Sequence, residues 1–93
     1  MNSLCWNCRG LGNAVTVREL RDLARQFAPS VFCVVETQLH KSRVECLNKT
    51  LGYDNSFGVS SEGRSGGLGI FWNNDTPLTI TKFYKYHIDA EVR

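Results

Sequence analysis

The fold is decided by the stretch Val31-Phe32-Cys33-Val34-Val35-Glu36-Thr37. Its first five residues form an unbroken β-branched and apolar run, which is typical of a strand buried on both faces of a sheet. The run ends directly on a carboxylate and a hydroxyl. A charged carboxylate in that position is unfavourable unless it is paired or binds a cation. We therefore expect a central strand over residues 31–35, with a candidate site at its carboxyl end.

Amphipathic patterns on either side of this run predict helices. Upstream, Thr16-x-x-Glu19 predicts a capping box that opens a helix, and Pro29 predicts its end. The apolar residues of that helix recur at helical spacing: Val17, Leu20, Leu23, Ala24 and Phe27. Downstream, Ser42-x-x-Glu45 predicts a second capping box, for a helix that ends at Gly52.

The rest of the chain favours strands and turns. A short strand over residues 3–8 precedes the first helix, and a glycine-rich turn follows it. Beyond Gly52, further strands are expected over residues 53–60, 68–72, 78–84 and 87–92. The predicted order is β-α-β-α-β-β-β-β within one α/β unit, residues 1–93. Early βαβ units followed by hairpins predict a mixed sheet with helices on one face.

Composition excludes several classes of protein. The chain has 93 residues, of which 42% are hydrophobic and 22% charged, which is typical of a globular domain and not of a disordered one. No apolar run approaches the roughly 18 residues of a membrane span, and the start lacks a secretion signal. We therefore expect an intracellular protein with no membrane partner. The net charge of +2 is compatible with a nucleic-acid partner without arguing for one.

The four cysteines leave one alternative open. Cys5-x-x-Cys8 has metal or redox spacing, but a zinc ribbon needs a second close pair, and Cys33 and Cys46 are far apart. A redox dithiol should also lie at a helix N-terminus, whereas a glycine-rich turn follows Cys8. A small CxxC metal or redox protein is the alternative reading, and free thiols are the default without a secretion signal.

Polar residues end two of the predicted strands. Asn7 ends the first strand, as Glu36 ends the central one. Such positions are the usual place for a site in an α/β sheet. From the residues alone, two interpretations stay open at each position. Glu36 is either a metal ligand or a hydrogen-bonded structural acid, and Asn7 is either a site residue or a turn-stabilising asparagine.

Several stretches carry a known pattern in the same order along the chain. They are Ser3-Leu4-Cys5-Trp6-Asn7-Cys8-Arg9-Gly10-Leu11-Gly12, Val17-Arg18-Glu19-Leu20, Glu36-Thr37, Ser61-Glu62-Gly63-Arg64-Ser65-Gly66-Gly67-Leu68 and His87-Ile88-Asp89-Ala90-Glu91-Val92. Together they resemble the endonuclease/exonuclease/phosphatase family. More narrowly, they resemble the N-terminal half of the apurinic-type endonuclease domain encoded by plant LINE-type (non-LTR) retrotransposons.

The resemblance implies a fold and a chemistry. The fold is a four-layered α/β sandwich, of which residues 1–93 would be a truncated, partial domain. The chemistry is Mg²⁺-dependent cleavage of phosphodiester bonds, with Mn²⁺ as an alternative cofactor. The implied substrate is DNA, nicked at the target site for reverse transcription. A nuclear location is implied where the chain is part of a retrotransposon protein.

The resemblance also assigns roles to residues. Glu36 would be the Mg²⁺ ligand, and Asn7 would lie beside it and orient the metal site and the scissile phosphate. Arg9 and Arg64 would meet nucleic-acid phosphates, and Gly66 would let the backbone approach the strand. A plain flexible hairpin is the alternative for residues 61–67.

Two motifs that complete the family's site, Asp-x-Asn and Ser-Asp-His, do not occur in residues 1–93. General base catalysis contributes about 10²–10⁴-fold, so we expect the chain alone to be nearly inactive. A second hypothesis is a non-catalytic half-domain that binds nucleic acid through Arg9, Arg64 and Lys85. An unpaired sheet edge and an uncovered sheet face also predict self-association.

Overall fold

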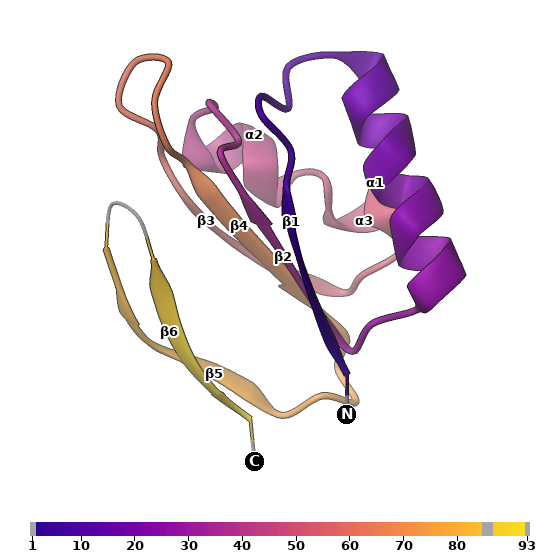
Figure 1. Ribbon diagram of the computed structural model, residues 1–93. Coiled ribbons are helices and arrows are strands. Elements are labelled where there is room, and N and C mark those ends of the chain that lie inside the picture. The colour runs from indigo at the N-terminus through magenta and orange to yellow at the C-terminus, as the bar shows by residue number, and fades with distance from the viewer. Residues whose placement is uncertain (1, 85–86, 93) are drawn as a thin grey trace.

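The structure is a computed structural model that describes residues 2–84 and 87–92. Its helices and strands follow the expected order, with the second helical region divided in two (Figure 1). They are β1 (Ser3–Asn7), α1 (Ala14–Phe27), β2 (Val31–Val35), α2 (Lys41–Glu45), α3 (Asn48–Leu51), β3 (Asn55–Val59), β4 (Leu68–Trp72), β5 (Leu78–Phe83) and β6 (Ile88–Val92). Within the described ranges, no helix is long and apolar enough to cross a membrane.

The main sheet is mixed, as predicted, and has the strand order β1-β2-β4-β3. β1 runs parallel to β2, and β4 runs antiparallel to both of its neighbours, β2 and β3. The helices lie on one face of this sheet, which confirms the expected layering (Figure 1). The hairpin β5–β6 was also predicted, but it forms a separate two-stranded sheet on the opposite face.

β2 is the central strand that the apolar run predicts, but its two faces are buried to different degrees. Phe32 and Val34 are fully buried in the core beneath the helices. Cys33 and Val35, on the other face, are only half-buried and line a cavity beside Ile88 of the hairpin. Full burial therefore holds for the helix-covered face alone, because the hairpin covers the other face incompletely.

The start of α1 differs from the prediction. The N-cap is Asn13, whose Oδ1 accepts a hydrogen bond from the Thr16 N–H at 2.9 Å, so the predicted Thr16-x-x-Glu19 capping box is wrong. Asparagine is at least as good an N-cap as threonine, and its use here starts the helix earlier. The predicted end is confirmed, since the helix stops at Phe27, ahead of Pro29.

The second predicted capping box is also wrong. His40 caps α2 through Nδ1, which accepts from the Ser42 N–H at 3.2 Å. The carboxylate of Glu45 instead accepts from the Gly58 N–H at 2.9 Å and so ties α2 to β3. Gly52 ends α3 in the left-handed conformation, with φ 88°, as predicted.

Two glycines let α2 lie directly on the sheet. A Cβ built on Gly58 would be 3.0 Å from the Lys41 carbonyl oxygen, and one on Gly69 would be 2.6 Å from Val44 Cγ1. Val44 is fully buried. The close approach of this helix therefore depends on the absence of side chains at two facing positions of β3 and β4.

We predict that Gly69→Ala destabilises the fold by about 1–3 kcal/mol, because the new methyl overpacks against Val44 and Val34. Gly12→Ala is the matched control, since a Cβ there meets nothing within 4 Å. Urea unfolding followed by circular dichroism measures both. Equal stabilities of the two variants would contradict the predicted close packing.

Tyr53 anchors the junction between α1 and β2. Its buried ring lies between Phe32 and Phe71, with centroids 6.3 Å from each. Its hydroxyl donates to the Pro29 carbonyl oxygen at 2.8 Å. Burial raises the pKa of Tyr53 to about 12, because the phenolate would lose its hydration.

This shift predicts a loss of stability at alkaline pH. Above pH 10, the unfolded chain releases the Tyr53 proton while the folded chain keeps it up to about pH 12. Stability therefore falls as the pH rises through that window, by on the order of 2 kcal/mol. Tyr53→Phe should remove this part of the decline, whereas Tyr84→Phe, at an exposed ring, should keep it. Unfolding free energies at pH 9 and 11.5 test this, and parallel declines for all three proteins would refute it.

Candidate functional site

Asn7 and Glu36 lie at the carboxyl ends of neighbouring parallel strands. Asn7 pairs with Val35 in the register of β1 and β2, so it stands one position before Glu36. Asn7 is exposed and Glu36 is half-buried. The structure thus brings both predicted site residues to one edge of the sheet.

Three loops interlock at this edge through backbone hydrogen bonds. The loop after β1 donates to the loop after β2 at two points, from Gly10 to Glu36 at 2.7 Å and from Leu11 to Thr37 at 2.9 Å. The loop after β2 donates in turn to the loop before β4. These bonds run from Thr37 to Gly67 at 3.1 Å and from Gln38 to Gly66 at 2.9 Å. The peptide groups of loop 36–38 are therefore held from both sides.

The same loops concentrate left-handed backbone conformations. Arg9, Glu36 and Gln38 have φ values of 48°, 59° and 58°, and Ala28 is the other non-glycine residue with positive φ among those described. Such a conformation costs about 1–2 kcal/mol for a residue with a Cβ. Strained residues of this kind cluster at functional sites when the surrounding structure holds them in place.

The Glu36 carboxylate has the features of an available ligand. Within the described residues, its oxygens make no hydrogen bond or ion pair, so the structure offers no support for a hydrogen-bonded structural acid. Hydrogen bonds to this residue involve its backbone carbonyl, which accepts from Gly10 N and from Cys8 Sγ. The Glu36 side chain thus has no hydrogen-bond or ion-pair partner within residues 2–84 and 87–92.

Asn7 shows the turn-stabilising role that the sequence left open. Its Oδ1 accepts from the Arg9 N–H at 3.1 Å and so holds the left-handed turn at Arg9. This bond also fixes the orientation of the amide, because the oxygen faces Arg9. A carbonyl oxygen has two lone pairs, so one of them is still open. The amide nitrogen of Asn7 is left to donate.

These donors fit a hard divalent cation. Mg²⁺ takes oxygen ligands, uses one or two carboxylates and keeps several waters. Glu36 supplies one carboxylate, and Asn7 supplies one amide oxygen. In the part of the chain that the structure describes, no group of three or more His, Cys, Asp and Glu side chains could hold a metal. The residues present thus fit a hard divalent cation that takes most of its ligands from water.

The cysteines do not form the CxxC site of the alternative reading. Cys8 is buried and its thiol donates to the Val35 carbonyl at 3.2 Å, while Cys5 is exposed on β1. Burial raises the pKa of Cys8, with a smaller contribution from the Glu36 charge. Burial likewise raises the pKa of Cys33 to about 11. Reactive and metal-binding thiols need the opposite shift.

The residues predicted to contact nucleic acid lie around this edge. Arg9 is exposed in the first loop, and Arg64 is exposed in the turn closed by the Glu62–Ser65 bridge. Gly66 is buried, and its carbonyl accepts from Gln38. Lys85, the remaining predicted contact, lies outside the described residues.

Sequence reasoning missed the two residues that follow Glu36. Thr37 is fully buried, and a Cβ on Gly67 would collide with its hydroxyl. The side-chain oxygen of Gln38 lies over Gly10, 3.0 Å from where a Cβ would be. In the sequence, the Gly66-Gly67 pair indicates only that another segment packs closely against this loop. Nothing in the sequence marks Gln38.

Comparison with known proteins identifies the family. The sequence model described as the Endonuclease/Exonuclease/phosphatase family matches residues 4–93. The chain belongs to this family. No curated protein matches the sequence.

Two solved structures share the fold. The catalytic domain of Xenopus laevis APE2 is 19% identical, with a TM-score of 0.54, and the match covers 83% of this chain. The AP endonuclease LMAP from Leishmania major is 24% identical, with a TM-score of 0.53 and 78% coverage. In both cases this chain spans 24% of the solved chain, which is about a quarter of the structure's length.

The close packing of Gly67 against Thr37 gives a prediction about the stability of this chain. Gly67→Ala should destabilise the fold by about 1–3 kcal/mol more than Gly63→Ala. Both positions have positive φ, 92° and 60°, but a Cβ on Gly63 meets nothing within 4 Å. Comparing the two variants thus separates the stability lost by collision with Thr37 from the stability lost by placing a side chain at positive φ. Thermal or urea unfolding measures the difference, and equal losses would show that the loops tolerate the added methyl.

Proposed function

We propose that this chain supplies the Asn7–Glu36 part of a metal-dependent phosphodiesterase site that acts on DNA. One observation carries the proposal. The side chains of Asn7 and Glu36, which both carry oxygen, lie at the carboxyl ends of the parallel strands β1 and β2. Interlocking hydrogen bonds hold the left-handed conformations of the adjoining loops. Membership of the endonuclease/exonuclease/phosphatase family supports it. The fold shared with a structure named as an AP endonuclease supports DNA as the substrate.

Each residue then has a distinct task. Glu36 holds the cation through its unpaired carboxylate, and Mg²⁺ or Mn²⁺, when bound, neutralises charge on the phosphate and the leaving oxygen. The Arg9 N–H fixes the Asn7 amide, so that its NH₂ group is oriented to donate to a phosphate oxygen. Thr37 and Gly67 act only by holding the backbone of the site.

Basic and glycine positions around the site are proposed to hold the strand. Arg9 and Arg64 are exposed cations on two of the loops at this edge. They are suited to phosphate contacts, which position a nucleic acid without reading its sequence. The buried Gly66 and Gly67, at the entry to β4, would contribute by keeping the Arg64 turn close to loop 36–38, which donates hydrogen bonds to both of their carbonyls.

A complete site needs a base for the attacking water. The Asp-x-Asn and Ser-Asp-His motifs do not occur in residues 1–93. We propose that these residues alone nick DNA more slowly than a complete site does, by a factor of about 10²–10⁴ or more. The motif pattern of residues 3–12 and 61–68 further favours an origin in a plant LINE-type retrotransposon, with a nuclear target.

Exposed apolar groups support self-association of this chain. Phe83, Tyr84 and Val92 are exposed large hydrophobic residues of the hairpin region. β1 and β3 are also edge strands of the main sheet. Such surfaces favour contact with another chain.

Metal binding tests the proposed role of Glu36. Glu36→Gln should lower Mn²⁺ affinity about tenfold or more, because it removes the charged ligand. Glu19→Gln, at an exposed carboxylate of α1, makes the same change in net charge and should leave the affinity unchanged. Water-proton relaxation enhancement of Mn²⁺ measures both variants. Plasmid nicking in Mg²⁺ is the second readout, and nicking that survives Glu36→Gln would refute the proposal.

A further inference from the structure

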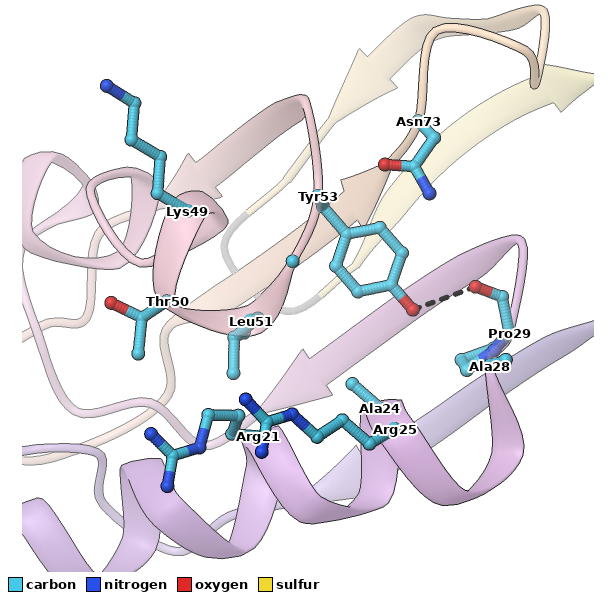
Figure 2. Close-up of a pocket in the computed structure, with 11 residues that line it drawn as sticks. Arg21, Ala24, Arg25, Ala28, Pro29, Lys49, Thr50, Leu51, Tyr53 and Asn73 are labelled. Carbon is cyan, nitrogen blue, oxygen red and sulfur yellow. Dashed lines mark hydrogen bonds between the residues drawn. The ribbon is translucent and has the colours of Figure 1, made fainter.

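A basic groove lies between α1 and α3, apart from Asn7 and Glu36. Two cavities of about 320 and 350 Å³ share the lining residues Arg21 and Thr50, so they adjoin each other along α1 and together form the basic groove. Figure 2 shows Arg21 and Arg25 projecting from α1 toward Thr50 and Leu51, whereas the side chain of Lys49 points away from α1. Among the described residues, the lining contains no carboxylate, and its cations on α1 are Arg18, Arg21 and Arg25.

Arg21 lacks a partner for a buried donor. Its Nε atom is buried and, within residues 2–84 and 87–92, makes no hydrogen bond. Buried polar atoms are normally paired, so one without an acceptor calls for an explanation. The guanidinium presents its donors in a planar fork that matches the oxygens of a phosphate. Nε itself has almost no accessible surface, so an anion in the groove would meet this guanidinium at its other nitrogens.

Charge is unevenly placed around α1. Arg21 and Arg25 are four residues apart, so they repel each other on one face of the helix. The helix dipole favours Arg25, which is in the last turn, but not Arg21. The acidic residues Glu19 and Asp22 line a different cavity, beside Trp6. The positive face therefore has no counter-charge of its own among the groups lining the groove.

Neutral donors complete the lining. Thr50 lines both cavities. Asn73 lies at the far rim in Figure 2, and its Oδ1 accepts from the Asp54 N–H at 3.1 Å, which leaves its NH₂ group to donate. An arrangement of cations, a hydroxyl and an amide donor is suited to an anion with several oxygens.

We propose that this basic groove binds the phosphodiester backbone of a nucleic acid strand, as a second contact surface separate from Asn7 and Glu36. The spread of the cations favours a strand over a single phosphate. Arg18 and Arg25 are seven residues apart, which is about 10 Å at 1.5 Å per residue. A strand carries one phosphate per roughly 3.4 Å of helix axis, so the groove spans about three phosphates.

Salt-dependent binding tests the groove. The probe is a fluorescein-labelled 20-nucleotide single-stranded DNA, titrated by anisotropy in EDTA at 50–300 mM KCl. The double variant R18Q/R25Q removes two exposed cations of the groove. It should lower the salt slope by about 1.4 and the affinity about tenfold at 100 mM salt, since each lost contact to a single strand removes about 0.7 from the slope.

The matched control is R43Q/K82Q, which also removes two exposed cations but lies outside the groove. It should keep the affinity within twofold. Equal losses in the two doubles, or no loss in either, would overturn the proposal, as would equally tight binding of a neutral methylphosphonate strand. Circular dichroism melts confirm that each variant folds.

Two further variants separate this groove from the proposed active site. R21Q removes the unpaired buried donor and should weaken binding at least as much as R25Q alone. R9Q/R64Q removes two exposed cations at the edge that carries Asn7 and Glu36, and it should cost less affinity in EDTA than R18Q/R25Q. A larger loss in R9Q/R64Q would place the strand at that edge and overturn the groove, whatever the outcome of the Mn²⁺ titration.

Discussion

The hydrogen-bond ladder between β1 and β2 continues past the ends of both strands, and the candidate site depends on this continuation. After Asn7, the N–H groups of Cys8, Gly10 and Leu11 donate in turn to the carbonyls of residues 35, 36 and 37. The loop after β2 then donates to Gly66 and Gly67 on its other side. Loop 36–38 is thus held between two neighbours, and the left-handed conformations of Glu36 and Gln38 follow from that constraint. Because backbone bonds fix the loop, its conformation does not depend on the Glu36 side chain, whose carboxylate makes no hydrogen bond or ion pair among the described residues.

The fold could be predicted from the sequence wherever apolar pattern decides it. The run 31–35 and the strand 68–72 were placed correctly, because burial selects β-branched and apolar residues at every position or on one face. The starts of the helices were not placed correctly. Asn13 and His40 cap α1 and α2 in place of the expected Thr16 and Ser42, since several polar residues near a helix start compete for the same free N–H groups. The layer occupied by β5–β6 is set by tertiary packing, such as the contact of Phe83 with Phe57 at 5.2 Å between centroids.

The candidate site was predictable only in part, for a related reason. Asn7 and Glu36 could be placed at one edge because strand direction alone brings the ends of parallel strands together. The conformation of the loops at that edge could not be predicted, because it depends on hydrogen bonds between segments far apart in the chain. Gln38 takes φ 58° through its bond to Gly66, twenty-eight residues away, and no local signal encodes it. Thr37 is buried beside Gly67, and its hydroxyl also accepts from the Leu39 N–H at 3.4 Å.

The site and the basic groove are connected by the geometry of α1. The helix begins at Ala14, three residues beyond the loop that Leu11 ties to Thr37, and it ends at Phe27, near the amino end of β2. Ala14 and Arg18 line one end of the groove, and Ala28 and Pro29 line the other. α1 runs from the loops that carry Asn7 and Glu36 toward the opposite end of the strands (Figure 1), so the groove lined by its residues extends in the same direction. A strand seated in it would be directed toward the site loop that contains Arg9. Arginines on one helix would then guide a strand to the site without taking part in the chemistry.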